Sequence, residues 1–105
     1  MGERNEPLPM ACRMDAMDAA QRARHGELAG RLRRATLETR ELPDGFAFRL
    51  PAAEWSSAAE FISLERLCCP FLGFTLELAR EVGPLWLRLT GQDGVKEFLK
   101  EELSL

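Results

Sequence analysis

The sequence predicts an α+β fold in the order α-ββα-ββα, an open-faced sandwich with a four-stranded, mainly antiparallel sheet and helices on one face. Apolar residues alternate in four short segments, and turn-forming residues join these segments in pairs. Each pair precedes a segment with helical spacing, so residues 37–69 and 73–103 form two similar ββα units. Because each expected strand has one apolar and one mixed face, the helices should cover only one side of the sheet.

Length and charge limit the class of protein. The 105 residues suit one domain with a modest core, and the net charge of −3 argues against a nucleic-acid partner. The start of the chain lacks the apolar core of a secretory signal, and no apolar run has the length of a membrane span. We therefore expect a soluble, cytoplasmic protein with no membrane partner. Residues 1–14 should form an extended N-terminal arm and residues 15–105 a single domain.

The first helix should begin near Asp15 or Asp18 and end at about Leu37. Asp18 followed by Gln21 three residues later is typical of a capping box, in which each residue bonds the other's backbone amide. Apolar residues recur through the segment at roughly helical spacing, but they form a narrow stripe. We expect this helix to cover the sheet and keep a wide polar face in water.

The first ββα unit begins with strands over about 37–42 and 46–50. The sequence Pro43-Asp44-Gly45 between them is a strong turn signal, because glycine accepts a positive φ. A helix over about 53–67 follows, and Pro70 should end it because proline has no amide hydrogen to donate.

The second unit repeats this order. Strands are expected over about 74–78 and 85–90, with a turn around residues 81–84. The last helix should run over about 93–103, with its apolar residues on one side.

Three cysteines dominate the functional interpretation: Cys12 in the arm, and the adjacent pair Cys68 and Cys69 at the expected end of the second helix. An odd number of cysteines in a reducing compartment argues against a disulfide framework. Thiolates favour soft cations such as Hg(II), Cu(I) and Zn(II). If the fold brings Cys12 to the pair, the three thiols would bind one such ion, and the protein would serve as a metal buffer, carrier or sensor.

A fourth ligand is harder to name. Zinc in structural sites usually has four ligands. Glu65 precedes Cys68 by one helical turn, so we expect its carboxylate beside the thiols, as a hydrogen-bonding neighbour or a ligand. His25 is the only imidazole in the chain, but its polar-rich helix favours a surface position.

Three alternatives remain open. Cys68 could be a small core residue and Cys69 an inert loop thiol, because free cysteine is often buried. Cys12 could form a reversible disulfide with either of them, as a redox switch. Alternatively, the mixed sheet face around Trp86 could bind a protein partner or a second copy of the chain. No phosphate-binding loop, dinucleotide fingerprint or nucleophile elbow is present, which favours a non-catalytic role.

The chain also resembles small, uncharacterised bacterial proteins. The resemblance covers nearly the whole chain and lies in four blocks: a short cysteine segment at 12–14, Glu-Leu-Pro-Asp-Gly at 41–45, Glu-x-x-Cys-Cys-Pro-Phe at 65–71, and Gly-Pro-Leu-Trp-Leu-Arg-Leu-Thr-Gly at 83–91. The Cys-Cys-Pro-Phe block is the most specific of these. Such proteins are loosely associated with heavy-metal (mercury) resistance, so the resemblance implies a thiophilic metal ligand.

Overall fold

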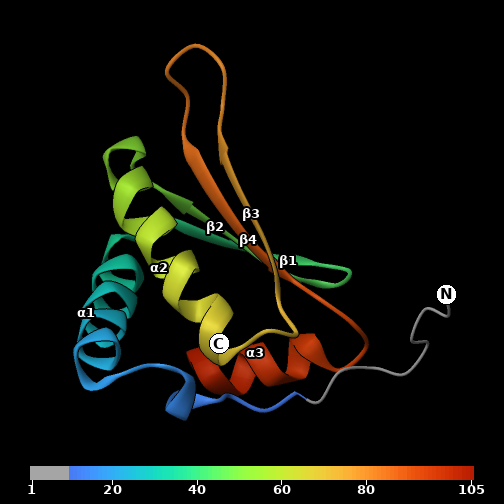
Figure 1. The fold of residues 1–105 in the computed structure, drawn as a ribbon. Helices are drawn as coiled ribbons and strands as arrows, with labels where there is room; N and C mark the ends of the chain where they lie inside the picture. The colour runs from blue at the N-terminus through green and yellow to red at the C-terminus, as the bar shows by residue number, and fades with distance from the viewer. Residues whose placement is uncertain (1–9) are drawn as a thin grey trace, which may run out of the picture.

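The computed structural model describes residues 10–105 and confirms the predicted order α-ββα-ββα (Figure 1). Its elements are α1 (Ala19–Ala35), β1 (Glu38–Leu42), β2 (Gly45–Leu50), α2 (Trp55–Cys68), β3 (Gly73–Leu78), β4 (Leu85–Thr90) and α3 (Val95–Leu103), with 3-10 turns at Met14–Ala16 and Ala52–Glu54. The expected arm over residues 1–14 falls largely outside the described residues. Its described part contains no strand, and Met14 already belongs to a 3-10 turn.

Helix α1 begins where the sequence predicts. The Asp18 carboxylate accepts a hydrogen bond from the Gln21 backbone N–H at 2.8 Å, and the Gln21 side chain accepts one from the Asp18 N–H at 2.9 Å. This reciprocal pair satisfies two amides at the start of the helix that would otherwise have no partner in the backbone. The predicted capping box is therefore confirmed.

The sheet is antiparallel throughout, with strand order β1-β2-β4-β3. The last strand of each ββα unit, β2 and β4, meets its counterpart at the centre, and their inward residues face one another in register: Phe46 with Leu89, Phe48 with Leu87, and Leu50 with Leu85. The two strands that begin the units, β1 and β3, are the edges. The sequence gives no basis for this order, because it depends on how the two units pack.

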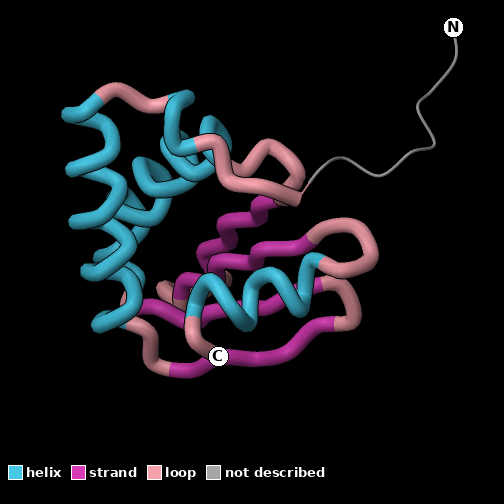
Figure 2. Tube along the Cα trace, turned by 90° about the horizontal axis from the view of Figure 1, so that it is seen from below, coloured by secondary structure: helices cyan, strands magenta, loops and turns pink. Residues whose placement is uncertain are grey.

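The three helices lie against the inner face of the sheet, with α1 and α2 side by side and α3 near the ends of the strands (Figures 1 and 2). The buried residues form one continuous core of apolar side chains from the sheet and all three helices, together with Met17, Cys68 and Cys69. The two adjacent thiols are therefore part of the same core that holds α2 on the sheet.

Strand β1 differs from the other three, because its inward face is polar. Thr39 is exposed, and Glu41 forms an ion pair with Lys96 at the start of α3. The expectation of one apolar face on every strand is therefore wrong for β1. An edge strand borders solvent, so an ion pair can replace buried carbon there at little cost.

Candidate metal centre

A backbone hydrogen bond brings the N-terminal segment to the end of α2. The Arg13 N–H donates to the carbonyl oxygen of Cys68 at 2.6 Å. The last carbonyls of a helix have no partner inside the helix, so the segment satisfies one of them. The residue before Arg13 is Cys12, and this bond therefore places its side chain at the adjacent pair.

The three sulfurs lie close together. The Sγ of Cys12 is 3.0 Å from that of Cys69, and the Sγ of Cys69 is 3.5 Å from that of Cys68. Both separations exceed the roughly 2.05 Å of a disulfide, and all three cysteines are free thiols. Sulfurs that share one ion at about 2.3 Å are separated by about 4 Å or less, so the observed spacing suits a shared cation.

The thiols differ in their access to solvent. Cys68 and Cys69 are 1% and 2% exposed, whereas Cys12 lies at the surface. Cys69 follows the last residue of α2, as a loop thiol would, but it is buried: its backbone N–H donates to the Glu65 carbonyl at 2.7 Å, which keeps it against the helix end and inside the core. An ion would therefore reach the buried pair from the side of Cys12.

All three thiols resist ionisation. Burial is the main cause that raises the pKa of each, and it raises that of Cys68 to about 12. The carboxylate of Glu65 adds to the shift at every cysteine, and that of Glu102 adds to it at Cys12. The thiols are neutral at pH 7 and are weak nucleophiles, because the thiolate is the reactive form. A bound metal ion removes this obstacle, since coordination deprotonates the thiol.

Glu65 and His25 extend the cluster beyond Cys68. The Cys68 thiol donates to Glu65 Oε1 at 3.3 Å, and the same oxygen is 2.7 Å from His25 Nε2. The side chains of Glu65 and His25 are only 13% and 16% exposed. Glu65 therefore lies beside the thiols, and it pairs with the histidine.

The expected surface position of His25 is wrong. Its ring stacks on Phe61 of α2 with centroids 5.4 Å apart, between the two packed helices. The spacing along α1 contains a signal for this position. His25 precedes the buried residues Leu28 and Leu32 by three and seven residues, which places it on the same helical face.

Trp86 lies on the outer face of the sheet but is only partly exposed. The guanidinium of Arg40 covers its ring at 4.6 Å from the centroid, and its neighbours across the sheet are Arg49 and Glu77. Binding of a protein partner at this face stays a prediction.

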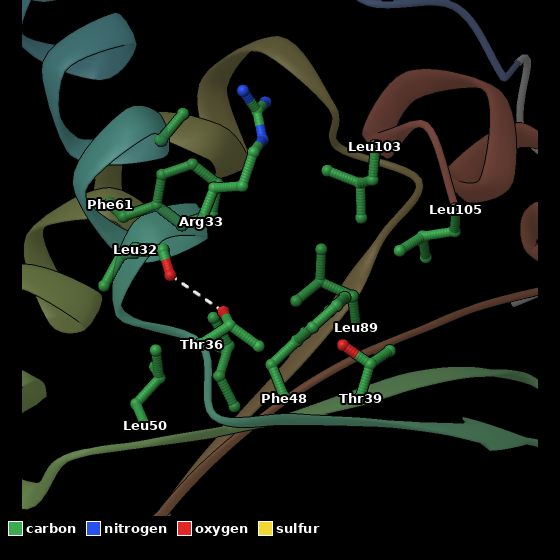
Figure 3. Close-up of a pocket in the computed structure, with 12 residues that line it drawn as sticks. Leu32, Arg33, Thr36, Thr39, Phe48, Leu50, Phe61, Leu89, Leu103 and Leu105 are labelled. Carbon is green, nitrogen blue, oxygen red and sulfur yellow. Dashed lines mark hydrogen bonds between the residues drawn. The ribbon is translucent and has the colours of Figure 1, made fainter.

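An apolar cavity of about 240 Å³ lies away from the thiols, between α1, the inner face of the sheet and the C-terminal residues Leu103 and Leu105 (Figure 3). Arg33 lies at its rim, and the Thr36 hydroxyl donates to the Leu32 carbonyl at 2.8 Å. Among the described residues that line it, no side chain has a thiol, carboxylate or imidazole group.

Comparisons with protein families, with curated proteins and with solved structures give no match for this chain. Within residues 10–105, no helix combines the length and the apolar character that a membrane span requires. The proposals below therefore rest on the geometry of the site.

Proposed function

We propose that the protein binds one soft metal ion, such as Hg(II), Cu(I) or Zn(II), through Cys12, Cys68 and Cys69, and serves as a buffer, carrier or sensor for that ion. The observation that supports this most strongly is the 3.0 Å separation of Cys12 Sγ from Cys69 Sγ, across 57 positions of sequence. Three thiols gathered by the fold form the donor set that thiophilic ions prefer.

The surroundings of the thiols also favour a cation. Glu65 and Glu102 place negative charge near Cys12, which raises the pKa of that thiol by disfavouring a further anion. The same negative potential attracts a positive ion to the exposed side of the site. An ion that arrives at Cys12 has the two buried sulfurs directly behind it.

The raised thiol pKa values argue against a nucleophilic enzyme. Catalytic cysteines have a lowered pKa, produced by nearby positive charge. Here burial and carboxylates act in the opposite direction. A neutral thiol cluster suits reversible metal binding, in which the ion itself displaces the protons.

Native mass spectrometry of the reduced protein with Hg(II), Cu(I) and Zn(II) tests the proposal. We expect one Hg(II) or Cu(I) ion per chain, with the affinity for that ion lowered at least about tenfold in Cys12→Ser and further in the Cys12→Ser, Cys68→Ser double variant. Met14→Ser is the matched control, because it alters a sulfur-bearing side chain of the same segment outside the cluster. Unchanged binding in the double variant would contradict the proposal.

A redox switch is a second candidate, favoured by the same short distance. Mild peroxide would oxidise Cys12 and Cys69 to a disulfide, with both thiol hydrogens lost as one peroxide becomes two waters. Peptide mapping should then find a Cys12–Cys69 link and a free Cys68, reversible by dithiothreitol. An intact mass unchanged by peroxide would rule out the switch and leave the metal proposal standing.

A further inference from the structure

We propose that His25, Glu65 and Cys68 form a site for a borderline divalent cation, Zn(II), which overlaps the three-thiol site through Cys68. This inference rests on the proposed function only where it concerns competition between the two sites. The zinc site itself depends on the contacts of Cys68 Sγ with Glu65 and of Glu65 with His25, which involve neither Cys12 nor Cys69.

The three ligand atoms are already gathered. A ring nitrogen of His25, a carboxylate oxygen of Glu65 and the Cys68 Sγ all lie within 4.8 Å of one another. In a tetrahedral zinc site, with bonds of about 2.0–2.3 Å, neighbouring ligand atoms are separated by about 3.3–3.8 Å. The 2.7 Å separation of the Glu65 oxygen from His25 would therefore widen by about 0.6 Å, and its 3.3 Å separation from Cys68 by about 0.2 Å.

Two elements hold these side chains in place. Glu65 and Cys68 are three residues apart on α2 and so lie on the same side of the helix. His25 comes from α1, where its ring stacks on Phe61 with an interplanar angle of 21°. A site built from two packed helices needs no loop to close around the ion.

The donor atoms fit zinc better than they fit a soft ion. An imidazole nitrogen, a carboxylate oxygen and a thiolate sulfur are all common zinc ligands, and three protein ligands with one water is a familiar zinc arrangement. Soft ions would instead choose the three sulfurs. The cluster thus offers two different donor sets that meet at one atom.

Sharing Cys68 predicts competition between the two metals. The sulfur lies 3.3 Å from the Glu65 oxygen and 3.5 Å from Cys69 Sγ. A soft ion would draw this thiolate toward Cys12 and Cys69, and so remove the only sulfur of the zinc site. One equivalent of Hg(II) should therefore release the bound zinc, which a colorimetric chelator detects.

Zinc titration of three variants separates the sites. Cys12→Ser, Cys69→Ser retains all three proposed ligands and should still bind one Zn(II). His25→Gln should bind Zn(II) at least about tenfold more weakly, while its affinity for Hg(II) is unchanged. Glu27→Gln is the control, because it removes an exposed carboxylate from the same helix without touching the site. Zinc binding lost in the thiol double variant but intact in His25→Gln would overturn the proposal.

Nitrogen NMR of the imidazole gives a measurement that does not depend on a variant folding. The chain has one histidine, so its ring signals are unambiguous. Zinc should shift the Nε2 resonance strongly in the wild-type protein and in the Cys12→Ser, Cys69→Ser variant. An unchanged resonance in zinc-saturated protein would show that His25 only bonds Glu65 and would overturn the zinc site. Failure of Hg(II) binding with this shift present would instead contradict only the three-thiol site.

Discussion

Cys68 is the residue at which the contacts of the site converge. Its sulfur contacts both Cys69 and the Glu65 carboxylate, and its carbonyl oxygen accepts the hydrogen bond from Arg13 that places Cys12. Substitution of this side chain therefore affects both donor sets, whereas Cys12 and His25 each affect one.

Metal binding should weaken as the pH falls. The thiols are protonated at pH 7, because burial raises the pKa of each, so an ion must displace their protons. Each proton released changes the apparent affinity by about tenfold per pH unit. We expect Zn(II) affinity to rise steeply between about pH 6 and about pH 8, with proton release visible by calorimetry in buffers of different ionisation enthalpy. A pH-independent affinity would contradict binding through these thiols.

The metal-free protein should lose stability in alkali. Burial raises the pKa of Cys68 from an ordinary 9.0 to about 12. Between about pH 9 and about pH 12 the unfolded chain loses the Cys68 proton while the folded chain keeps it. The free energy of unfolding therefore falls as the pH rises through this range. Below pH 9 both states are protonated and the dependence disappears. Urea unfolding at about pH 8 and about pH 10 should show a smaller decrease in Cys68→Ala than in the wild-type protein.

At the scale of elements, the decisive contact is between the N-terminal segment and α2. The Arg13 N–H satisfies a carbonyl at the helix end, in the place where Cys69 and Pro70 stop the helix. The segment is held there by its backbone, so the identity of the Arg13 side chain matters less than its amide. This distinction can be tested directly.

Arg13→Pro removes the amide donor and should release Cys12 from the pair. We expect a loss of about 0.5–1.5 kcal/mol in the free energy of unfolding, and weaker Hg(II) binding, because only two thiols then remain in place. Arg13→Ala keeps the amide and is the matched control, with both quantities close to wild type. Equal metal affinity in the two variants would mean that Cys12 does not depend on this bond. Denaturant unfolding and native mass spectrometry provide the two measurements.

For the whole molecule, local patterns predict the fold well. The Asp18–Gln21 capping box, the turn at Asp44-Gly45 and the alternation in β2 and β4 all depend on residues close in sequence. Strand order and the meeting of Cys12 with Cys69 depend on contacts between distant segments, which periodicity does not specify. His25 was misplaced because a mostly polar helix still buries the face that packs on its neighbour.

Two leucines that pair in register across β3 and β4 should differ strongly in how much each contributes to the free energy of unfolding. Leu85 of β4 is 0% exposed, whereas its partner Leu78 of β3 is 54% exposed, near the turn beyond the cover of the helices. Leu85→Ala should cost about 2–5 kcal/mol of stability, because it leaves a cavity in the core. Leu78→Ala, the matched control, should change stability by less than about 0.5 kcal/mol. Similar losses in both would show that the second hairpin is buried in solution.

The Cys12 side chain precedes the first helix, while the other two sulfurs belong to the core. An ion bound by all three would fasten the beginning of the chain to the folded body. Occupancy would then be readable without observing the metal, as slower amide hydrogen exchange at Arg13 and slower cleavage by trypsin after it. The concentration of the ion would then decide whether the segment around Cys12 is held against the domain. A partner protein could recognise that difference in the surface.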